Sequence, residues 1–200
     1  MTIPWAADTS TADGQDVSPA DRILDGAARI YAERGMVGAD MATIAEEAGY
    51  SRATVYRYFE SREALQRAFV EREARRIADV LQQQFGHLPT RDRVVEAFLT
   101  SLEMLRSDPV LSAFIARSTH RGLAELVESP EIVGAIARTT FGDGADETAD
   151  GIYGARWLTR ALVSLLIAPG HDAADERRMI ADFVRPALDT GTGELADAAP

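Results

Sequence analysis

Arginine, tyrosine and threonine are concentrated in one short segment, residues 51–65, which reads SRATVYRYFESREAL. Arginine can donate two hydrogen bonds to guanine O6 and N7, and alanine and threonine can contact the methyl group of thymine. Tyrosine hydroxyls, and backbone N–H groups at the start of a helix, can hold phosphates. The residue types in this segment therefore favour contact with double-stranded DNA.

The distribution of charge also supports an anionic partner for this segment. The formal net charge of the 200-residue chain is −11. Residues 51–76 nevertheless contain seven arginines against four glutamates, a balance of +3, whereas residues 77–200 contain eleven arginines against nineteen acidic residues, a balance of −8. A positive region on an acidic chain indicates an anionic partner for that region alone.

Two short helices are predicted to position these side chains. Asp40 can cap a helix over residues 41–48, and Gly49 and Ser51 separate it from a second helix over residues 52–59. Two short helices joined by a glycine-containing turn are typical of a helix-turn-helix, whose second helix lies in the major groove of DNA.

The second of these helices has one apolar face. Val55 and Phe59 are four residues apart and are predicted to face the core, so the opposite face is free to contact DNA. A face rich in arginine and tyrosine could instead be an ordinary solvated surface, but the pattern on both sides of it favours DNA binding. The candidate DNA-binding residues are Thr43, Ser51, Arg52, Ala53, Thr54, Tyr56, Arg57, Tyr58 and Arg62.

Residues 23–65 resemble the tetracycline-repressor (TetR) family of bacterial regulators, with the core of the match in TIAEEAGYSRATVYRYFESREAL. The resemblance implies an all-helical homodimer that represses from a palindromic operator and is released by a small ligand. By position, Arg52, Ala53 and Thr54 would read bases. Tyr56 and Arg62 would hold phosphates, Tyr58 would contact a phosphate or sugar, and Arg57 could do either. Asp40 departs from the threonine or serine of many members and is interpreted as a helix cap.

The rest of the chain is also predicted to be helical, which makes the fold class all-α. Further helices are predicted over residues 18–34, 61–85, 90–106, 109–118, 121–128 and 130–140. A long helix is predicted to follow the loop GDGADET and to end at residue 168, and a last helix is predicted to begin at residue 172. Pro186 is expected to kink or end the last one, because proline lacks an N–H. We expect a disordered arm (1–17), a helix-turn-helix domain (18–65), a ligand-binding and dimerisation domain (66–190) and a disordered tail (191–200).

The larger domain contains enough apolar residues to surround a ligand. The candidates for an apolar cavity are Phe98, Leu102, Leu105, Phe114, Ile115, Phe141, Trp157 and Leu158. The candidates to orient a polar head group are His120, Arg156 and Arg160. Each of these could instead be ordinary core or a structural polar residue. The expected ligand is a small apolar or amphipathic molecule, for which an anionic head is plausible.

The last two predicted helices suit a dimer interface. Residues 161–168 are apolar all round and must be buried on more than one side. Two helices from each subunit would form a four-helix interface around a twofold axis. The candidate interface residues are Leu162, Leu166, Ile180, Phe183, Val184 and Leu188.

The composition argues against other classes of protein. The chain has no cysteine, which excludes disulfides and thiolate metal sites, and its histidines, His87, His120 and His171, lack the i, i+4 partner of a helical metal site. We therefore expect no enzyme activity, metal or cofactor. No apolar run is long enough for a membrane span, and the first residues are not a secretory signal, so a cytoplasmic location is expected. The alternative functions are a ligand-independent DNA-binding protein and an activator.

Overall fold

The computed structural model describes residues 18–189, with the side chains of residues 18–183. The arm and the tail that were expected to be disordered lie outside this part of the chain. Within it there are ten α-helices, one short 3-10 helix and no strand. The α-helices are α1 (Pro19–Gly38), α2 (Met41–Glu47), α3 (Arg52–Tyr58), α4 (Arg62–Phe85), α5 (Thr90–Ser107), α6 (Pro109–Arg117), α7 (His120–Val127), α8 (Pro130–Phe141), α9 (Ala149–Ile167) and α10 (Ala173–Asp189), with η1 (Ala145–Glu147) between α8 and α9.

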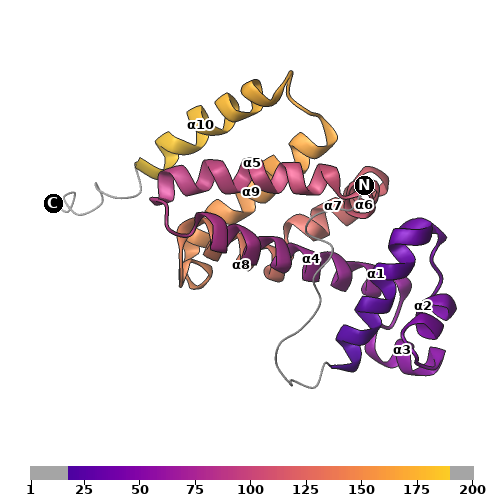
Figure 1. Ribbon diagram of the computed structural model, residues 1–200. Helices are drawn as coiled ribbons and strands as arrows, with labels where there is room; N and C mark the ends of the chain where they lie inside the picture. The colour runs from indigo at the N-terminus through magenta and orange to yellow at the C-terminus, as the bar shows by residue number, and fades with distance from the viewer. Residues whose placement is uncertain (1–17, 190–200) are drawn as a thin grey trace.

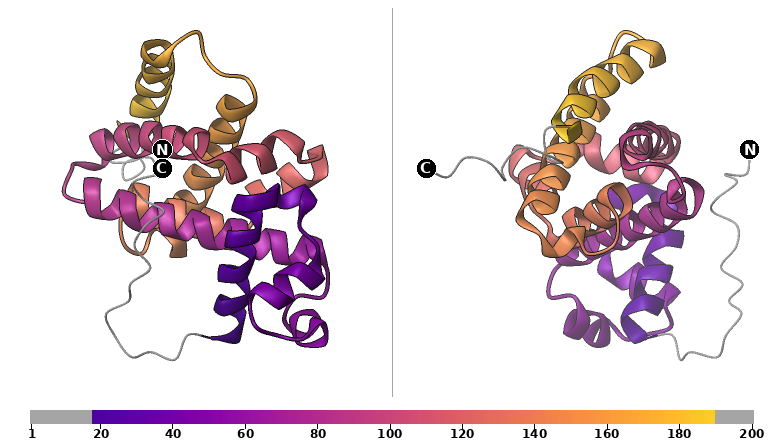
Figure 2. Two further views of the ribbon diagram at one scale, coloured as in Figure 1. Left: turned by 45° about the vertical axis from the view of Figure 1, so that its right-hand side comes forward. Right: turned by 90° about the vertical axis from the view of Figure 1, so that its left-hand side faces the viewer.

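The helices form a small N-terminal head and a larger C-terminal domain, which are joined by α4 (Figure 1). Helices α1, α2 and α3 pack around one end of α4. The other end of α4 packs against α5 and α8, and α9 packs on α8. Helix α10 packs on α5. It lies at the edge of the molecule away from the head, as both views of Figure 2 show. The predicted all-helical fold is therefore confirmed.

Most helices begin at a residue whose side chain caps them. The hydroxyls of Ser18 and Ser61 accept hydrogen bonds from the N–H groups of the third residues that follow, at 3.1 and 3.0 Å. The carboxylates of Asp108 and Asp172 do the same for α6 and α10, at 2.9 and 2.8 Å. Such caps satisfy N–H groups that have no partner inside the helix. Because a cap is local in sequence, these helix starts were predicted correctly.

Two helix ends test the predictions for glycine and proline. Gly35 has φ 70° and ψ 161°, so it breaks the regular part of α1 where the sequence predicted an end, and a further turn follows up to Gly38. This positive φ favours glycine because other residues meet a steric penalty there. Of the two outcomes expected at Pro186, a kink or an end, the structure excludes an end, since α10 continues to Asp189.

The core of the head includes part of α4. Val55 of α3 and Leu65 of α4 are fully buried, and the ring of Tyr31 from α1 meets that of Phe69 from α4 edge to face, with 5.1 Å between centroids. Arg72 of α4 adds hydrogen bonds to α1, at 2.8 Å to the carboxylate of Asp25 and 3.1 Å to a backbone carbonyl. A movement of α4 must therefore carry the head with it.

A partly buried ion pair fastens α10 to the C-terminal domain. Arg106 donates two hydrogen bonds to the carboxylate of Glu176, at 2.8 and 2.7 Å, and a third to the carbonyl of Leu165 at 2.9 Å. The Arg106 guanidinium lowers the pKa of Glu176, which stays ionised. Bidentate pairs of this kind fix geometry as well as charge, so α5, α9 and α10 are held in one arrangement.

Candidate DNA interface and ligand cavity

Helix α2 is oriented by its cap. Oδ1 of Asp40 accepts hydrogen bonds from the N–H groups of Ala42 and Thr43, at 2.8 and 2.9 Å, and the Thr43 hydroxyl donates to Oδ2 at 3.1 Å. These bonds to Thr43 and Ala42 lower the pKa of Asp40, because they favour the carboxylate. Asp40 is thus a helix cap, as the sequence predicted, and the Thr43 hydroxyl is bonded to that cap.

The turn between α2 and α3 depends on Gly49. Its φ is 74°, and the N–H of Tyr50 reaches back to the carbonyl of Ala45 at 2.8 Å. Ser51 then caps α3, since its hydroxyl accepts from the N–H of Thr54 at 3.1 Å. The tight turn leaves α3 crossing α2 with Val55 buried against it.

The outer face of α3 presents the side chains that the sequence singled out. Arg52, Ala53, Tyr56, Arg57 and Tyr58 are all exposed, and Thr54 is half-buried at the edge of the face. The guanidinium of Arg57 lies over the ring of Tyr58, 5.3 Å from its centroid. This cation–π contact favours a fixed direction for both side chains. The structure therefore brings these six residues together on one helix.

Arg62 has an internal role that the sequence did not reveal. Its Nη2 donates to the carbonyls of Met36 and Val37, at 2.8 and 3.0 Å, and Gln66 donates to the Met36 carbonyl at 3.1 Å. Carbonyls at a helix end have no partner within the helix, so α4 satisfies those at the end of α1. Arg62 is placed to hold the α1–α2 connection, and a phosphate contact would have to use its other nitrogens.

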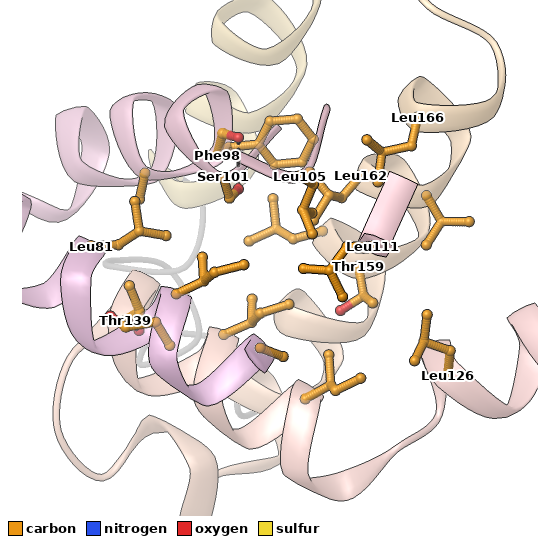
Figure 3. Close-up of a pocket in the computed structure, with 18 of the residues that line it drawn as sticks. Leu81, Phe98, Ser101, Leu105, Leu111, Leu126, Thr139, Thr159, Leu162 and Leu166 are labelled. Carbon is orange, nitrogen blue, oxygen red and sulfur yellow. Dashed lines mark hydrogen bonds between the residues drawn. The ribbon is translucent and has the colours of Figure 1, made fainter. Parts of the chain in front are cut away.

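A second feature of the structure is an apolar cavity of about 110 Å³ in the C-terminal domain (Figure 3). It is enclosed by side chains of α4, α5, α6, α8 and α9, together with Leu126 of α7. The lining residues on α4 and α5 are Val70, Ala74, Ile77, Ala78, Leu81, Val94, Ala97, Phe98, Ser101 and Leu105. Those on the later helices are Leu111, Phe114, Ile115, Leu126, Ile132, Ile136, Thr139, Thr140, Leu158, Thr159, Leu162, Val163 and Leu166.

Hydroxyl groups are the only polar side-chain groups among these lining residues. Those of Ser101 and Thr159 donate to carbonyls of their own helices, at 2.8 and 2.7 Å. That of Thr139 donates across to the carbonyl of Ala78 on α4, at 3.3 Å. The walls therefore suit an apolar group and offer hydroxyl oxygens as additional acceptors.

The comparisons with known proteins agree with this architecture. A sequence model described as "Bacterial regulatory proteins, tetR family" matches residues 23–69. An uncharacterised HTH-type transcriptional regulator of Mycobacterium tuberculosis is 40% identical over 169 residues, which is 84% of each chain. The chain belongs to the TetR family. It is a DNA-binding transcriptional regulator.

Other relatives agree over shorter spans or in fold alone. The transcriptional repressor AcnR of Corynebacterium diphtheriae is 32% identical over 96 residues, covering 44% of this chain and half of its own. The structure of the TetR-family repressor AlkX from Dietzia is 18% identical with TM-score 0.67, covering 88% of this chain and 98% of that one. The structure of RolR without ligand is 20% identical with TM-score 0.64, covering 90% of this chain and all of that one. These last two show the fold.

Only some of the residues predicted for the ligand site of this TetR-family chain line the cavity. Phe98, Leu105, Phe114, Ile115 and Leu158 do so. Leu102 is buried beside the cavity, in the core between α5 and α9, and does not line it. Phe141 packs at the end of α8 against the cores there and is likewise not a lining residue.

None of the residues predicted to orient a polar head group lines the cavity. Arg156 pairs with Glu128 at 2.8 Å, and Arg160 pairs with the same carboxylate, on the outside of the molecule. Trp157 is 44% exposed, and His120 is exposed at the start of α7. The reason is helical geometry: Leu158, Thr159 and Leu162 turn one face of α9 to the cavity, so the residues between them point outward.

Some of the residues predicted for the dimer interface face the interior of the C-terminal domain, and others are exposed. Leu162 and Leu166 line the cavity, and Ile180 is buried in the core of the C-terminal domain. Phe183 is 72% exposed, while the side chains of Val184 and Leu188 lie outside the described residues.

Other apolar residues are exposed on the same two helices. Tyr153 and Ile167 of α9 are 76% and 56% exposed, and Met179 of α10 is also exposed. These three were not predicted from the sequence, although the spacings from Tyr153 to Trp157 and from Met179 to Phe183 are both i, i+4 and could have indicated a stripe.

Neither a metal nor a membrane is indicated by the described residues. Between residues 18 and 189 no three histidine, aspartate or glutamate residues are grouped so that they could hold a metal ion. In the same range no helix is both long and apolar enough to cross a membrane.

Proposed function

We propose that this regulator is a homodimer that represses transcription from a palindromic operator and leaves it when a small ligand occupies the cavity of the C-terminal domain. In this proposal residues 18–65 bind DNA, and residues 66–190 bind the ligand and the second subunit. The observation that carries it is the course of α4. One end of this helix holds the core of the head through Leu65 and Phe69, and the other end forms a wall of the cavity through Ile77 and Leu81.

The roles proposed on α3 follow from exposure and chemistry. Arg52, Ala53 and Thr54 lie in the first turn, where a recognition helix contacts base edges. The hydroxyls of Tyr56 and Tyr58 can donate to phosphates, which positions the helix without reading sequence. Arg57 can reach a base or a phosphate from its place over the ring of Tyr58.

The exposed apolar residues of α9 and α10 support a dimer. Tyr153, Trp157 and Ile167 on α9, with Met179 and Phe183 on α10, leave apolar surface that a second copy of the chain would cover. A twofold dimer of this kind presents two copies of α3, and a palindromic operator matches them when its half-sites lie about 34–36 Å apart.

Release requires that the ligand bind one arrangement of α4 better than the other. A molecule in the cavity touches α4 directly and can change its tilt, which would alter the spacing of the two α3 helices. A repressive role is supported by the name of the relative AcnR, a transcriptional repressor that is similar over 96 residues of the chain.

The test uses DNA sites selected by the purified protein from a random pool, with 1-hexanol as the probe for the cavity. Saturating 1-hexanol should lower operator affinity by a factor within the usual range of allosteric coupling, about 5–150-fold. By linkage the operator should lower the affinity for 1-hexanol by the same factor. If 1-hexanol binds and operator affinity stays the same, control through the cavity is wrong.

A further inference from the structure

A groove of about 560 Å³ lies where the head meets the C-terminal domain. One wall is formed by the end of α1 and the first turns of α4, and the other by α6 and α7. Helices α1 and α6 pack against each other beside it, at the junction that Figure 1 shows between the head and the larger domain.

The groove is cationic, although the chain as a whole is acidic. Five arginines and two glutamates line it, a balance of +3 in a chain of formal net charge −11. The arginines are Arg34, Arg62, Arg67, Arg117 and Arg121, and the glutamates are Glu63 and Glu125. A concave surface lined by one sign of charge concentrates ions of the opposite sign.

Several of these guanidinium groups are available to a ligand. Within the described part of the chain, neither Arg34 nor Arg117 has an ion-pair or hydrogen-bond partner. Arg67 approaches Glu125 only to 3.9 Å, because Arg121 lies nearer to that carboxylate, at 3.0 Å. Arg34 belongs to the head and Arg117 to the C-terminal domain, and both line the groove.

The groove adjoins the apolar cavity. Phe114 of α6 and Leu126 of α7 line both spaces, so their side chains form the wall between them. Both are half-buried, and a ligand that occupied both spaces would have to displace them. The apolar cavity therefore lies next to a groove that contains two arginines, Arg34 and Arg117, that are unpaired within the described residues.

We propose that the groove holds the anionic end, a carboxylate or a phosphate, of an amphipathic ligand whose apolar end occupies the cavity. The inference rests on the proposed ligand-binding function of that cavity. A cavity of about 110 Å³ is smaller than the engineered cavity of roughly 150 Å³ that accepts benzene. The apolar end is therefore a short alkyl chain. Its anionic end bridges Arg34 and Arg117 and so links occupancy to the position of the head.

The test compares three probes by calorimetry: hexyl phosphate, 1-hexanol and inorganic phosphate. Hexyl phosphate should bind at least tenfold more tightly than either of the other two. The double variant Arg34→Gln/Arg117→Gln should remove most of that advantage, because a charge-assisted hydrogen bond contributes roughly a factor of ten or more. It should leave the affinity for 1-hexanol unchanged. Arg178→Gln, an exposed arginine on α10, is the matched control and should change nothing.

The outcomes separate this inference from the function it rests on. The inference is wrong, and the groove is a solvated surface, if hexyl phosphate binds no more tightly than 1-hexanol or if the double variant does not change its affinity. Neither result would contradict the proposed binding of a ligand in the cavity. If 1-hexanol does not bind at all, the proposed cavity function fails. Inorganic phosphate could also bind in a way that depends on the two arginines. If hexyl phosphate then bound no more tightly than inorganic phosphate, the proposal of a ligand with an apolar and an anionic end would be wrong.

Discussion

Enlarging Ala97 should stabilise the protein if the cavity is real. Ala97 lies on α5, is 4% exposed and lines the cavity. Leucine there adds three carbon atoms, and burying them is worth about 2.4 kcal/mol at about 0.8 kcal/mol per methylene. The cavity gives a similar figure, since filling 110 Å³ at about 24 cal/mol per Å³ recovers about 2.6 kcal/mol. Alanine and leucine both have high helix propensity, so the substitution should change the stability of the helix backbone very little.

Some of this gain will be lost because leucine will not fit the space perfectly. We expect a net stabilisation of about 1–2 kcal/mol, which corresponds to a rise in Tm of about 2–8 °C for a domain of this size. The variant should also bind 1-hexanol more weakly, because the added carbons occupy its place. Thermal and denaturant unfolding, each with and without 1-hexanol, measure both effects.

The matched control is Ala137→Leu. Ala137 lies on α8, is fully buried and does not line the cavity. Overpacking a solid core costs about 1–3 kcal/mol, so this variant should unfold at a lower temperature. If Ala97→Leu were destabilised as much as Ala137→Leu, the space beside Ala97 would be solid core and the ligand proposal would lose its site.

Three further substitutions test other parts of the structure. Tyr56→Phe should weaken binding to specific and random DNA by the same factor, about fivefold for one lost hydrogen bond, and a change in the ratio of the two affinities would contradict a phosphate contact. Phe183→Asp should convert dimers to monomers in sedimentation velocity, because an unpaired charge would be buried in the proposed interface; a well-folded dimer would place the interface elsewhere. Burial raises the pKa of Glu73 despite Arg72 and Arg76 nearby, so the folded protein loses stability as pH rises through that pKa. Glu73→Gln should therefore raise Tm at pH 7–8 and have the Tm of the wild type near pH 4. Glu103→Gln, at an exposed position on α5, is the control and should not show this dependence on pH. Equal Tm values for Glu73→Gln and the wild type at every pH would contradict the prediction.

Features that depend on local sequence were predicted well. The caps at Asp40 and Ser51 bond to residues two or three positions away, so the sequence contains both partners. The inward face of α3 follows from the four-residue spacing of Val55 and Phe59, both of which are buried. The helix-turn-helix and its exposed arginines could therefore be placed from the sequence alone.

Features that depend on the orientation of distant helices were predicted poorly. Arg156 and Arg160 do share one face of α9, but their spacing cannot say whether that face meets a cavity or solvent. Phe98 and Leu102 are both buried on α5, and only the packing of the neighbouring helices decides that Phe98 alone lines the cavity. Arg34 and Arg117 are 83 positions apart in the chain, so their groove left no pattern in the sequence.

In vitro selection from a random pool of DNA duplexes tests the central claim most directly, namely that the exposed face of α3 reads an operator. The wild-type protein should enrich an inverted repeat whose half-sites lie about one helical turn, or a multiple of it, apart. Arg52→Ala should lose about 1–3 kcal/mol on that site and relax the preference at one base pair of each half-site. Enrichment of no motif by the wild type, or of the same motif with the same affinity by Arg52→Ala, would contradict the assignment of α3 as the reading helix.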